Sequence, residues 1–381
     1  MNQKELNEIR RRVRPDRNNI GHIYGCYVNS NGEIISRLDV SLALATHDEQ
    51  EMFLTLLKKS ISGSLGRNLL DIPFSARQVM EGEAHKLLSE LRNSRLQNEN
   101  AREEFYRRVI ACVNMEECNY VILLGCDVYD VPFRGKDRQR QDEASRDVFP
   151  YILCAVCPVK DAEMALRFFN EENAFHGAST GHTIAAPTLG FMFPTFDDRQ
   201  ANIYNALFYT HDPADNHQAF VDTVFRVDPP MTSVEQNETF HSVLGDSLET
   251  DCRLDVVQAV HEQISGRIQE HKESHDPDPL ELTAGDVTNM LVDSGVSPEK
   301  AESFRKKCAE EFGENAVLNP NNIINKNRFE IATEEVTVSV KPEFSYLVET
   351  RIIDEKKYIL IPADGEITVN GVPVCIPKEE E

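Results

Sequence analysis

The sequence predicts an α+β protein: a mixed or antiparallel sheet body with helices, a helical insertion and a C-terminal β module. Three observations predict this fold class. Strand-like apolar runs alternate with helical patterns over residues 1–230, helical periodicity takes over in 231–326, and β-rich segments return in 327–381. We therefore expect a main α+β body, an acidic helical module and a small β module with these bounds, and the β module could complete the first sheet.

The start of the body predicts a capped helix followed by a hairpin. Residues 2–13 have helical periodicity, Asn2 can cap them, and Glu5 stands three positions further on, as in a capping box. Two β-rich runs then flank Asn31-Gly32, a pair that favours the positive φ values of a tight hairpin turn. Residues 48–61 follow as an amphipathic helix.

The middle of the body predicts two buried strands among helices. Tyr120–Leu124 is a continuous apolar run, typical of a strand covered on both faces, and we expect it to pair antiparallel with Tyr151–Cys157. The charged residues 134–147 between them predict an exposed loop. The other expected elements are helices over 75–93, 98–114, 161–173 and 215–225, and strands over 182–186, 189–193 and 202–210, which Pro187 and Pro194 would place at edges or turns.

The segment from His182 to Asp212 is the most aromatic and least charged run of its length, and we expect it to be mainly interior scaffold. It contains one compact charged group. Adjacent carboxylates can hold a divalent cation or share a proton, and a guanidinium can bind an anion. The candidate binding residues are Asp197, Asp198, Arg199 and Asn202. We favour the simpler interpretation, an Asp-rich turn in which Arg199 bridges two segments.

Four histidines are candidate metal ligands: His176 with His182, and His211 with His217. Aspartates lie near them, and imidazole together with carboxylate suits zinc, iron or manganese. A spacing of six residues has no standard metal geometry, in contrast to HExxH on a helix. We therefore favour structural roles for these side chains, and the sequence indicates no particular cofactor.

The first twenty residues form the clearly basic segment of the chain. Arg10, Arg11 and Arg12 lie on the first predicted helix, and Gly63-Ser64-Leu65-Gly66 precedes Arg67 in the manner of the GxxG turn of KH-type RNA modules. These four arginines are candidates for binding RNA or another anion. We favour a solvated helix face paired with acids, and a glycine turn that ends a helix.

The charge balance disfavours several classes of partner. Acidic residues outnumber basic ones 64 to 40, for a formal net charge of −24, so the surface on average repels nucleic acid and anionic membranes, although a local basic patch could exist. Residues 231–326 hold 19 acidic residues against 8 basic ones, which argues against DNA binding by the helix–turn–helix outline in this module. No long apolar run and no signal-peptide core are present, so we expect a cytoplasmic protein without a membrane span.

The nine cysteines predict reduced thiols of a cytosolic protein, because their number is odd and most have apolar neighbours. Cys154 and Cys157 form a lone CxxC. It lies in a predicted strand, where positions i and i+3 point to opposite faces, so we expect buried structural cysteines rather than a redox or metal pair.

Several segments together resemble the family called domain of unknown function 4317, from Gram-positive anaerobic bacteria. They are KELNEIRRR, GCYVN with GEIIS, LLDIPFSARQVMEGEAHKLL, YVILLGCDVYDVP, YILCAVCPVK, FDDRQANIYNALFYT and LVETRIIDEKKYILIPADGEITVNGV. The resemblance spans nearly the whole chain and is least clear over 231–325. It implies a bacterial, soluble, intracellular protein and carries no activity with it.

No nucleophile elbow, Rossmann glycine fingerprint or kinase signature is present, so the sequence favours a protein that is not an enzyme. The first hypothesis is a non-catalytic binding or regulatory factor that acts through protein contacts. One alternative is a metal-dependent hydrolase centred on the histidines and aspartates of residues 176–217. A second alternative is a translation-associated RNA-binding factor that uses the N-terminal arginines and the GxxG turn, by loose analogy with release-factor-like proteins.

Overall fold

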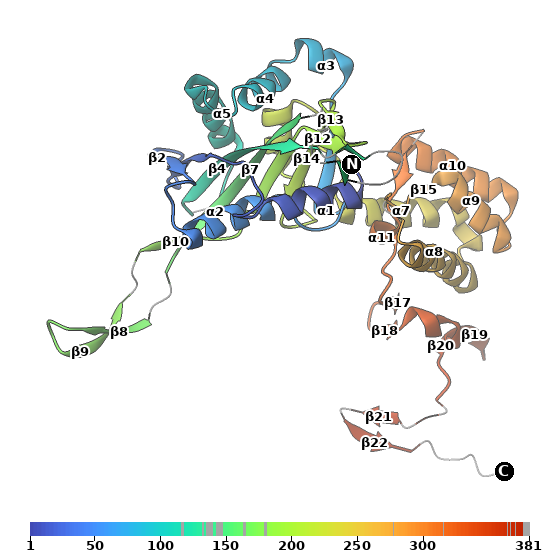
Figure 1. Ribbon diagram of the computed structural model, residues 1–381. Helices are drawn as coiled ribbons and strands as arrows, with labels where there is room; N and C mark the ends of the chain where they lie inside the picture. The colour runs from blue at the N-terminus through green and yellow to red at the C-terminus, as the bar shows by residue number, and fades with distance from the viewer. Residues whose placement is uncertain are drawn as a thin grey trace. The chain divides into compact units, whose positions relative to one another are not determined.

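The chain forms two compact units, one of Met1–Glu235 with Pro277–Pro279 and the other of Gln236–Asp276 with Leu280–Glu381 (Figure 1). The computed structural model describes residues 1–115, 118–131, 133–134, 140–141, 148–162, 165–178, 181–276, 278–314, 316–363, 365, 367–369 and 371–375. Helices and sheets occur together in an α+β arrangement, as the sequence predicts.

The first unit is built on an eight-stranded sheet in the order β2-β1-β4-β7-β11-β14-β3, with β10 paired to β7. Each of these pairs is antiparallel. The strands are β1 (His22–Val28), β2 (Ile34–Ser41), β3 (Leu69–Pro73), β4 (Tyr120–Asp130), β7 (Val148–Asp161), β10 (His182–Ile184), β11 (Leu189–Phe193) and β14 (Asn205–Thr210).

Helices cover both faces of this sheet (Figure 1). One face packs against α4 (Glu83–Asn93), α5 (Glu99–Cys112) and the π-helix Val221–Phe225, which follows the short α6 (Gln218–Phe220). The other face packs against α1 (Gln3–Arg12) and α2 (His47–Lys59). A sheet covered on both sides needs strands that are apolar on both faces, and β4 and β7 have this composition.

Local sequence signals set several of these elements. The capping box of Asn2 and Glu5 is present at the start of α1, as predicted, and such a cap stabilises a helix by about 1 kcal/mol. The hairpin of β1 and β2 closes where predicted, and Gly32 has a φ of 80° in its turn. The predicted pairing of the two buried strands is also confirmed, with Leu124 opposite Cys154.

The CxxC pair lies in β7 with its thiols on opposite faces, as predicted. Cys154 belongs to the core beneath α5, and Cys157 to the core beneath α2. Both side chains are fully buried, and all nine cysteines of the chain are free. These two residues therefore serve the interior of the sheet.

Three expectations about the body were wrong. Residues 161–173 are not a helix, because β7 runs to Asp161 and β8 (Ala165–Phe169) pairs with β9 (Ala174–Ala178). The order of apolar and charged residues in this segment fits the period of a helix and that of a strand, so the sequence pattern could not distinguish the two kinds of element. Residues 215–225 hold α6 and the π-helix instead of one regular helix. The strand β11 is interior and not at an edge, because its flanking prolines lie just outside it.

The other smaller elements of the first unit are α3 (Ala76–Glu81) and the pairs β5 (Phe133–Arg134) with β6 (Arg140–Gln141) and β12 (Thr195–Asp197) with β13 (Gln200–Asn202). The predicted exposed loop at 134–147 lies largely outside the described residues. Most of the aromatic middle segment is interior, since β11 and most of β14 are buried, while β10 at its start is largely exposed.

The second unit begins within α7 and holds a group of helices with their own core. Its helices are α7 (Ser233–Leu248), α8 (Leu254–Ser274), α9 (Ala284–Asp293), α10 (Pro298–Phe312) and α11 (Pro320–Ile323), and β15 (Leu282–Thr283) pairs with β16 (Val317–Leu318). Phe240 of α7 and Phe304 of α10 meet at its centre with ring centroids 6.0 Å apart. Full burial of a side chain of this size stabilises the fold by about 1.5–3 kcal/mol.

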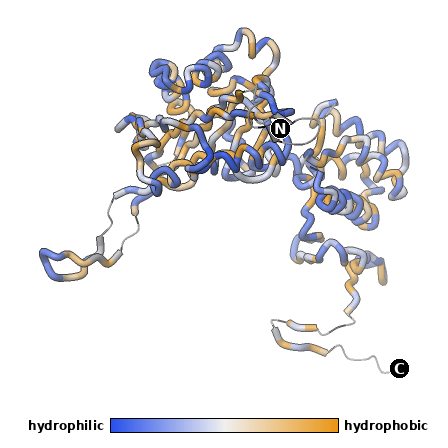
Figure 2. The backbone as a smooth tube through the Cα atoms, viewed as in Figure 1, coloured by the Kyte–Doolittle hydropathy of each residue, from blue (hydrophilic) through white to orange (hydrophobic). Residues whose placement is uncertain are grey.

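The C-terminal β segment consists of three hairpins: β17 (Phe329–Ala332) with β18 (Thr337–Val340), β19 (Glu349–Ile353) with β20 (Lys356–Leu360), and β21 (Ile367–Val369) with β22 (Val372–Val374). Among the described residues these strands pair only within their hairpins. Figure 2 shows hydrophobic residues in these exposed hairpins as well as in the sheet.

Every helix in the described ranges is too short or too polar to cross a lipid bilayer.

Candidate functional site

The charged group at 197–199 is the turn of a hairpin. β12 and β13 pair with Asp197 opposite Gln200, and the two residues between them, Asp198 and Arg199, have φ values of 48° and 64°. Two successive left-handed residues make a hairpin turn that matches the twist of its strands. The local geometry of this group therefore has a structural explanation.

Asp197 and Asn202 contact each other. The Asn202 amide donates to the Asp197 carboxylate at 2.6 Å, the Thr195 hydroxyl donates to the same oxygen at 3.0 Å, and the amino group of Met1 forms an ion pair with the other oxygen. Burial alone would raise the pKa of Asp197, but the hydrogen bonds from Met1 and Asn202 hold it below its usual value. The carboxylate thus joins the start of the chain to the hairpin.

Arg199 bridges two segments, as we favoured from the sequence. Its guanidinium lies 3.2 Å and 3.3 Å from the two carboxylate oxygens of Glu8 on α1. The hydroxyl of Tyr129 also donates to Glu8. This ion pair joins α1 to the hairpin of β12 and β13.

The four histidines lie on separate elements. The imidazole of His176 on β9 is 2.8 Å from the Glu172 carboxylate, and that of His182 on β10 is 2.9 Å from Asp161. His211 follows β14, and its backbone N–H donates to the Thr188 carbonyl at 2.8 Å. Within the described ranges, no group of three or more His, Cys, Asp or Glu side chains has an arrangement that could hold a metal ion.

His217 lines an open hollow of about 510 Å³ in the first unit. Its φ of 48° is left-handed, and its ring meets that of Phe208 edge to face at 6.2 Å. Its Nδ1 atom is 3.2 Å from a carboxylate oxygen of Asp215. Burial lowers the pKa of His217, and the nearby Asp215 and Asp212 oppose that shift.

The hollow also receives residues from distant parts of the chain. Cys112 ends α5, and Thr188 precedes β11, where its hydroxyl contacts the carbonyl of Val156 at 3.3 Å. A left-handed residue followed by a π-helix is unusual backbone that is frequent at functional sites. The sequence offered only the close spacing of Asp215 and His217, because the other lining residues come from segments that the fold brings together.

The N-terminal arginines take different positions. Arg12 is bonded to the buried carboxylate of Asp127, at 3.0 Å and 3.2 Å. Arg10 donates to the carbonyl oxygens of Ile61 and Gly63, so the sequence-predicted helix and the GxxG turn do meet. Arg11 on α1 and Arg67 in the turn are both exposed.

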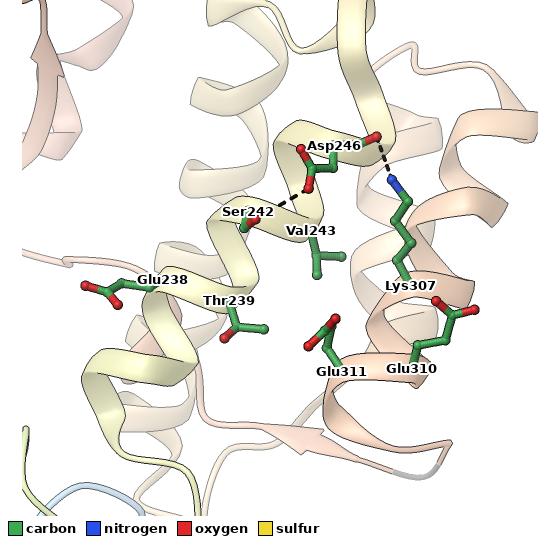
Figure 3. Close-up of a pocket in the computed structure, with 8 residues that line it drawn as sticks. All are labelled: Glu238, Thr239, Ser242, Val243, Asp246, Lys307, Glu310 and Glu311. Carbon is green, nitrogen blue, oxygen red and sulfur yellow. Dashed lines mark hydrogen bonds between the residues drawn. The ribbon is translucent and has the colours of Figure 1, made fainter.

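The helical unit has an acidic hollow of about 510 Å³ between α7 and α10 (Figure 3). Glu238, Glu310 and Glu311 lie around it, while Lys307 donates to the Asp246 carbonyl at 2.8 Å. The carboxylates give this hollow negative charge. The Ser242 hydroxyl in this hollow donates to the Asp246 carboxylate at 3.4 Å.

The described part of the first unit exposes apolar residues at several places, and two of these are surfaces formed by neighbouring side chains. On the hairpin of β8 and β9, Leu166, Phe168 and Phe175 are 75%, 47% and 66% exposed. The second surface is an open hollow of about 660 Å³ lined by α2 and β10, including Met52 and Ile184. Large exposed apolar surfaces mark contacts with other molecules.

The sequence matches a family model described as Domain of unknown function (DUF4317), over residues 1–372. A search of the curated proteins finds no match for this chain.

Proposed function

The chain belongs to the DUF4317 family, and we propose that it is a non-catalytic protein-binding factor. The observation that carries the proposal is the exposed apolar face of the hairpin formed by β8 and β9. We define the hairpin face as Leu166, Phe168 and Phe175. A protein that covered this face would remove apolar area from water, which is the main favourable term in protein association.

The register of the hairpin places these three side chains together. Phe168 is directly opposite Phe175, and Leu166 lies two residues before Phe168, so all three point to the same side. The two phenylalanine rings meet edge to face with centroids 5.2 Å apart. Aromatic residues clustered in this way are the usual anchors of protein interfaces.

The isolation of the hairpin supports the same function. β8 and β9 form a two-stranded sheet of their own within the described residues. A single two-stranded hairpin is at best marginally stable in water, and a third strand or a packed surface stabilises it. A partner would supply that surface.

Charge selects the kind of partner. Two copies of this chain would each carry a net charge of −24 and would repel each other on approach. We therefore propose a different protein, with a basic surface around an apolar patch. Opposite charge would speed the encounter, and the hairpin face would supply the buried contact.

The ion pairs and hydrogen bonds of the charged candidate residues also support binding rather than catalysis. Arg12 is paired with Asp127, Arg199 with Glu8, and Asp197 with the Met1 amine and Asn202. These contacts stabilise the fold.

We further propose that the protein acts in the cytosol, where a reducing environment suits nine free cysteines.

The test compares the wild type with Leu166→Asp and with Met80→Asp as control. Leu166→Asp places a charge on the hairpin face and leaves the Phe168–Phe175 pair in place. Met80 on α3 is 75% exposed, as is Leu166, but lies on another element of the same unit. A partner captured by the wild type from its native lysate is identified, purified and titrated against all three proteins.

We expect Leu166→Asp to weaken this affinity by about tenfold or more, which corresponds to about 1.4 kcal/mol. Met80→Asp should bind as the wild type does. Equal affinities for all three proteins, or a purified partner that binds none of them, would reject the proposal. Circular dichroism of each variant confirms that the fold is retained.

A further inference from the structure

We propose that a cluster of unpaired cations at the ends of α1 and α2 binds the phosphate backbone of single-stranded RNA. We define the basic cluster as Arg10, Arg14 and Lys58. This surface is separate from the hairpin face, and its role does not depend on the protein partner proposed above.

The geometry of the cluster is fixed by Arg10. Its Nε atom donates to the Ile61 carbonyl at 2.6 Å, and a terminal nitrogen donates to the Gly63 carbonyl at 2.7 Å. These bonds attach the end of α1 to the turn that follows α2. Since both acceptors are neutral, the positive charge of Arg10 is not cancelled.

Arg14 and Arg10 both lie close enough to act on Lys58. The pKa of Lys58 is lowered, first by burial and then by the positive charges of Arg14 and Arg10. In the described part of the chain, none of the three forms an ion pair with an Asp or Glu side chain. A bound anion would relieve this like-charge repulsion.

Acids are abundant, 64 in the chain, and two arginines on the same segment pair with them: Arg12 with Asp127, and Arg17 with Asp16. Among the described residues Arg11 forms no ion pair, as is the case for the three cations of the basic cluster. The end of α1 and the residues after it therefore carry positive charge that no acid within the described ranges neutralises. An anionic ligand is the occupant with complementary charge.

The adjoining turn favours a phosphate backbone over an acidic protein. Gly63 and Gly66 have φ values of 91° and 72°, and the exposed residues Gly63, Ser64 and Arg67 belong to this turn. Glycine allows a ligand backbone to approach closely. Turns of the GxxG type bind nucleotide backbones in this way. Gly63 has a structural role as well, because a Cβ there would lie 2.5 Å from the Cβ of Asn68.

The whole-molecule charge of −24 opposes binding, so recognition should be local and sensitive to salt. Neutralising about three phosphates on a single strand gives a slope of about −2 in a plot of log affinity against log salt. Binding should also be indifferent to base sequence, since contacts of cations with phosphates carry no sequence information.

The experiment measures fluorescence anisotropy of a labelled single-stranded RNA of about 12 nucleotides with the full chain, at about 50 and about 200 mM salt. The variant is Arg14→Gln with Lys58→Gln, which leaves Arg10 to hold the turn. The control is Lys4→Gln with Arg77→Gln, which removes the same number of positive charges from other exposed positions. Thermal unfolding verifies that each protein is folded.

We expect the wild type and the control to bind with the slope given above, and the cluster variant to lose about tenfold or more in affinity. Absence of binding at the lower salt, or equal binding by the cluster variant, would overturn the proposal. Competition by polyglutamate as strong as that by unlabelled RNA would also overturn it, and would identify an acidic protein as the occupant.

Discussion

The guanidinium of Arg12 donates two hydrogen bonds to the carboxylate of Asp127, whose side chain is completely buried. The Tyr151 hydroxyl donates to the same carboxylate at 2.8 Å, and the Asn19 backbone N–H at 2.7 Å. A buried charge costs free energy unless it is paired and hydrogen-bonded, and Asp127 has both kinds of compensation. This group joins α1 to the paired strands β4 and β7, and Arg12 and Asp127 are 115 residues apart in the sequence.

Replacing Asp127 by Asn should lower the free energy of unfolding by about 3–5 kcal/mol, because the Arg12 guanidinium would lose its counter-charge in a half-buried position. Urea unfolding measures this. The matched control is Asp16→Asn, which breaks the exposed pair with Arg17 and should cost less than about 1 kcal/mol. Similar losses for the two variants would contradict the structural role of Asp127.

Gly190→Ala should destabilise the first unit by about 1–3 kcal/mol, the usual cost of overpacking. A Cβ at Gly190 would lie 2.3 Å from the Cys154 carbonyl oxygen and 2.6 Å from the Cβ of Ser60, so neither neighbour can yield by a side-chain rotation. The control is Gly21→Ala in the same unit, where a Cβ meets nothing within 4 Å. Thermal unfolding should show a lower midpoint for the first variant alone. If both variants matched the wild type, the close approach of α2 to β11 would be in doubt.

Local signals made the fold class and many elements predictable from the sequence. The capping box of Asn2 and the turn at Asn31-Gly32 depend on neighbours in the chain, so the sequence contains them whole. The hairpin of β8 and β9 was missed, since its residues fit a helical period equally well. Its apolar face becomes apparent only when the register of the two strands is known, because the register places the three side chains on one side.

Long-range relationships could not be predicted in this way. The pairing of Arg12 with Asp127, and the approach of Arg10 to Gly63, depend on how α1 lies across the sheet. The hollow at His217 likewise combines Cys112 and Thr188, which are far apart in the sequence. Composition identified candidate residues, and only tertiary structure decided which of them meet.

Thiol labelling should separate the exposed cysteines from the buried ones, with the half-buried Cys112 between these two groups. Cys118, Cys252 and Cys375 are exposed and should react with Ellman's reagent within minutes, whereas the interior thiols should react only after unfolding. Burial raises the pKa of Cys26 and of Cys157 to about 12, so almost no thiolate is present near neutral pH. Mass spectrometry after brief labelling locates the modified residues. Early modification of Cys154 or Cys157 would show that the sheet opens readily.

Protonation of His217 should destabilise the first unit. Burial lowers the pKa of His217 in the folded state, so below about pH 6.5, its ordinary value, the unfolded chain binds a proton more readily than the native one. The contribution of His217 to stability is therefore complete above that pH and is lost as the pH falls toward its folded-state pKa. The stability advantage of the wild type over His217→Asn, a residue that tolerates left-handed backbone, should shrink between about pH 7.5 and about pH 5.5. Urea unfolding at both pH values measures it. The control Gln218→Ala leaves the imidazole in place, so its free energy of unfolding should depend on pH as that of the wild type does. If the stability difference between the wild type and His217→Asn stayed constant with pH, the hollow would not hold His217 in its neutral form.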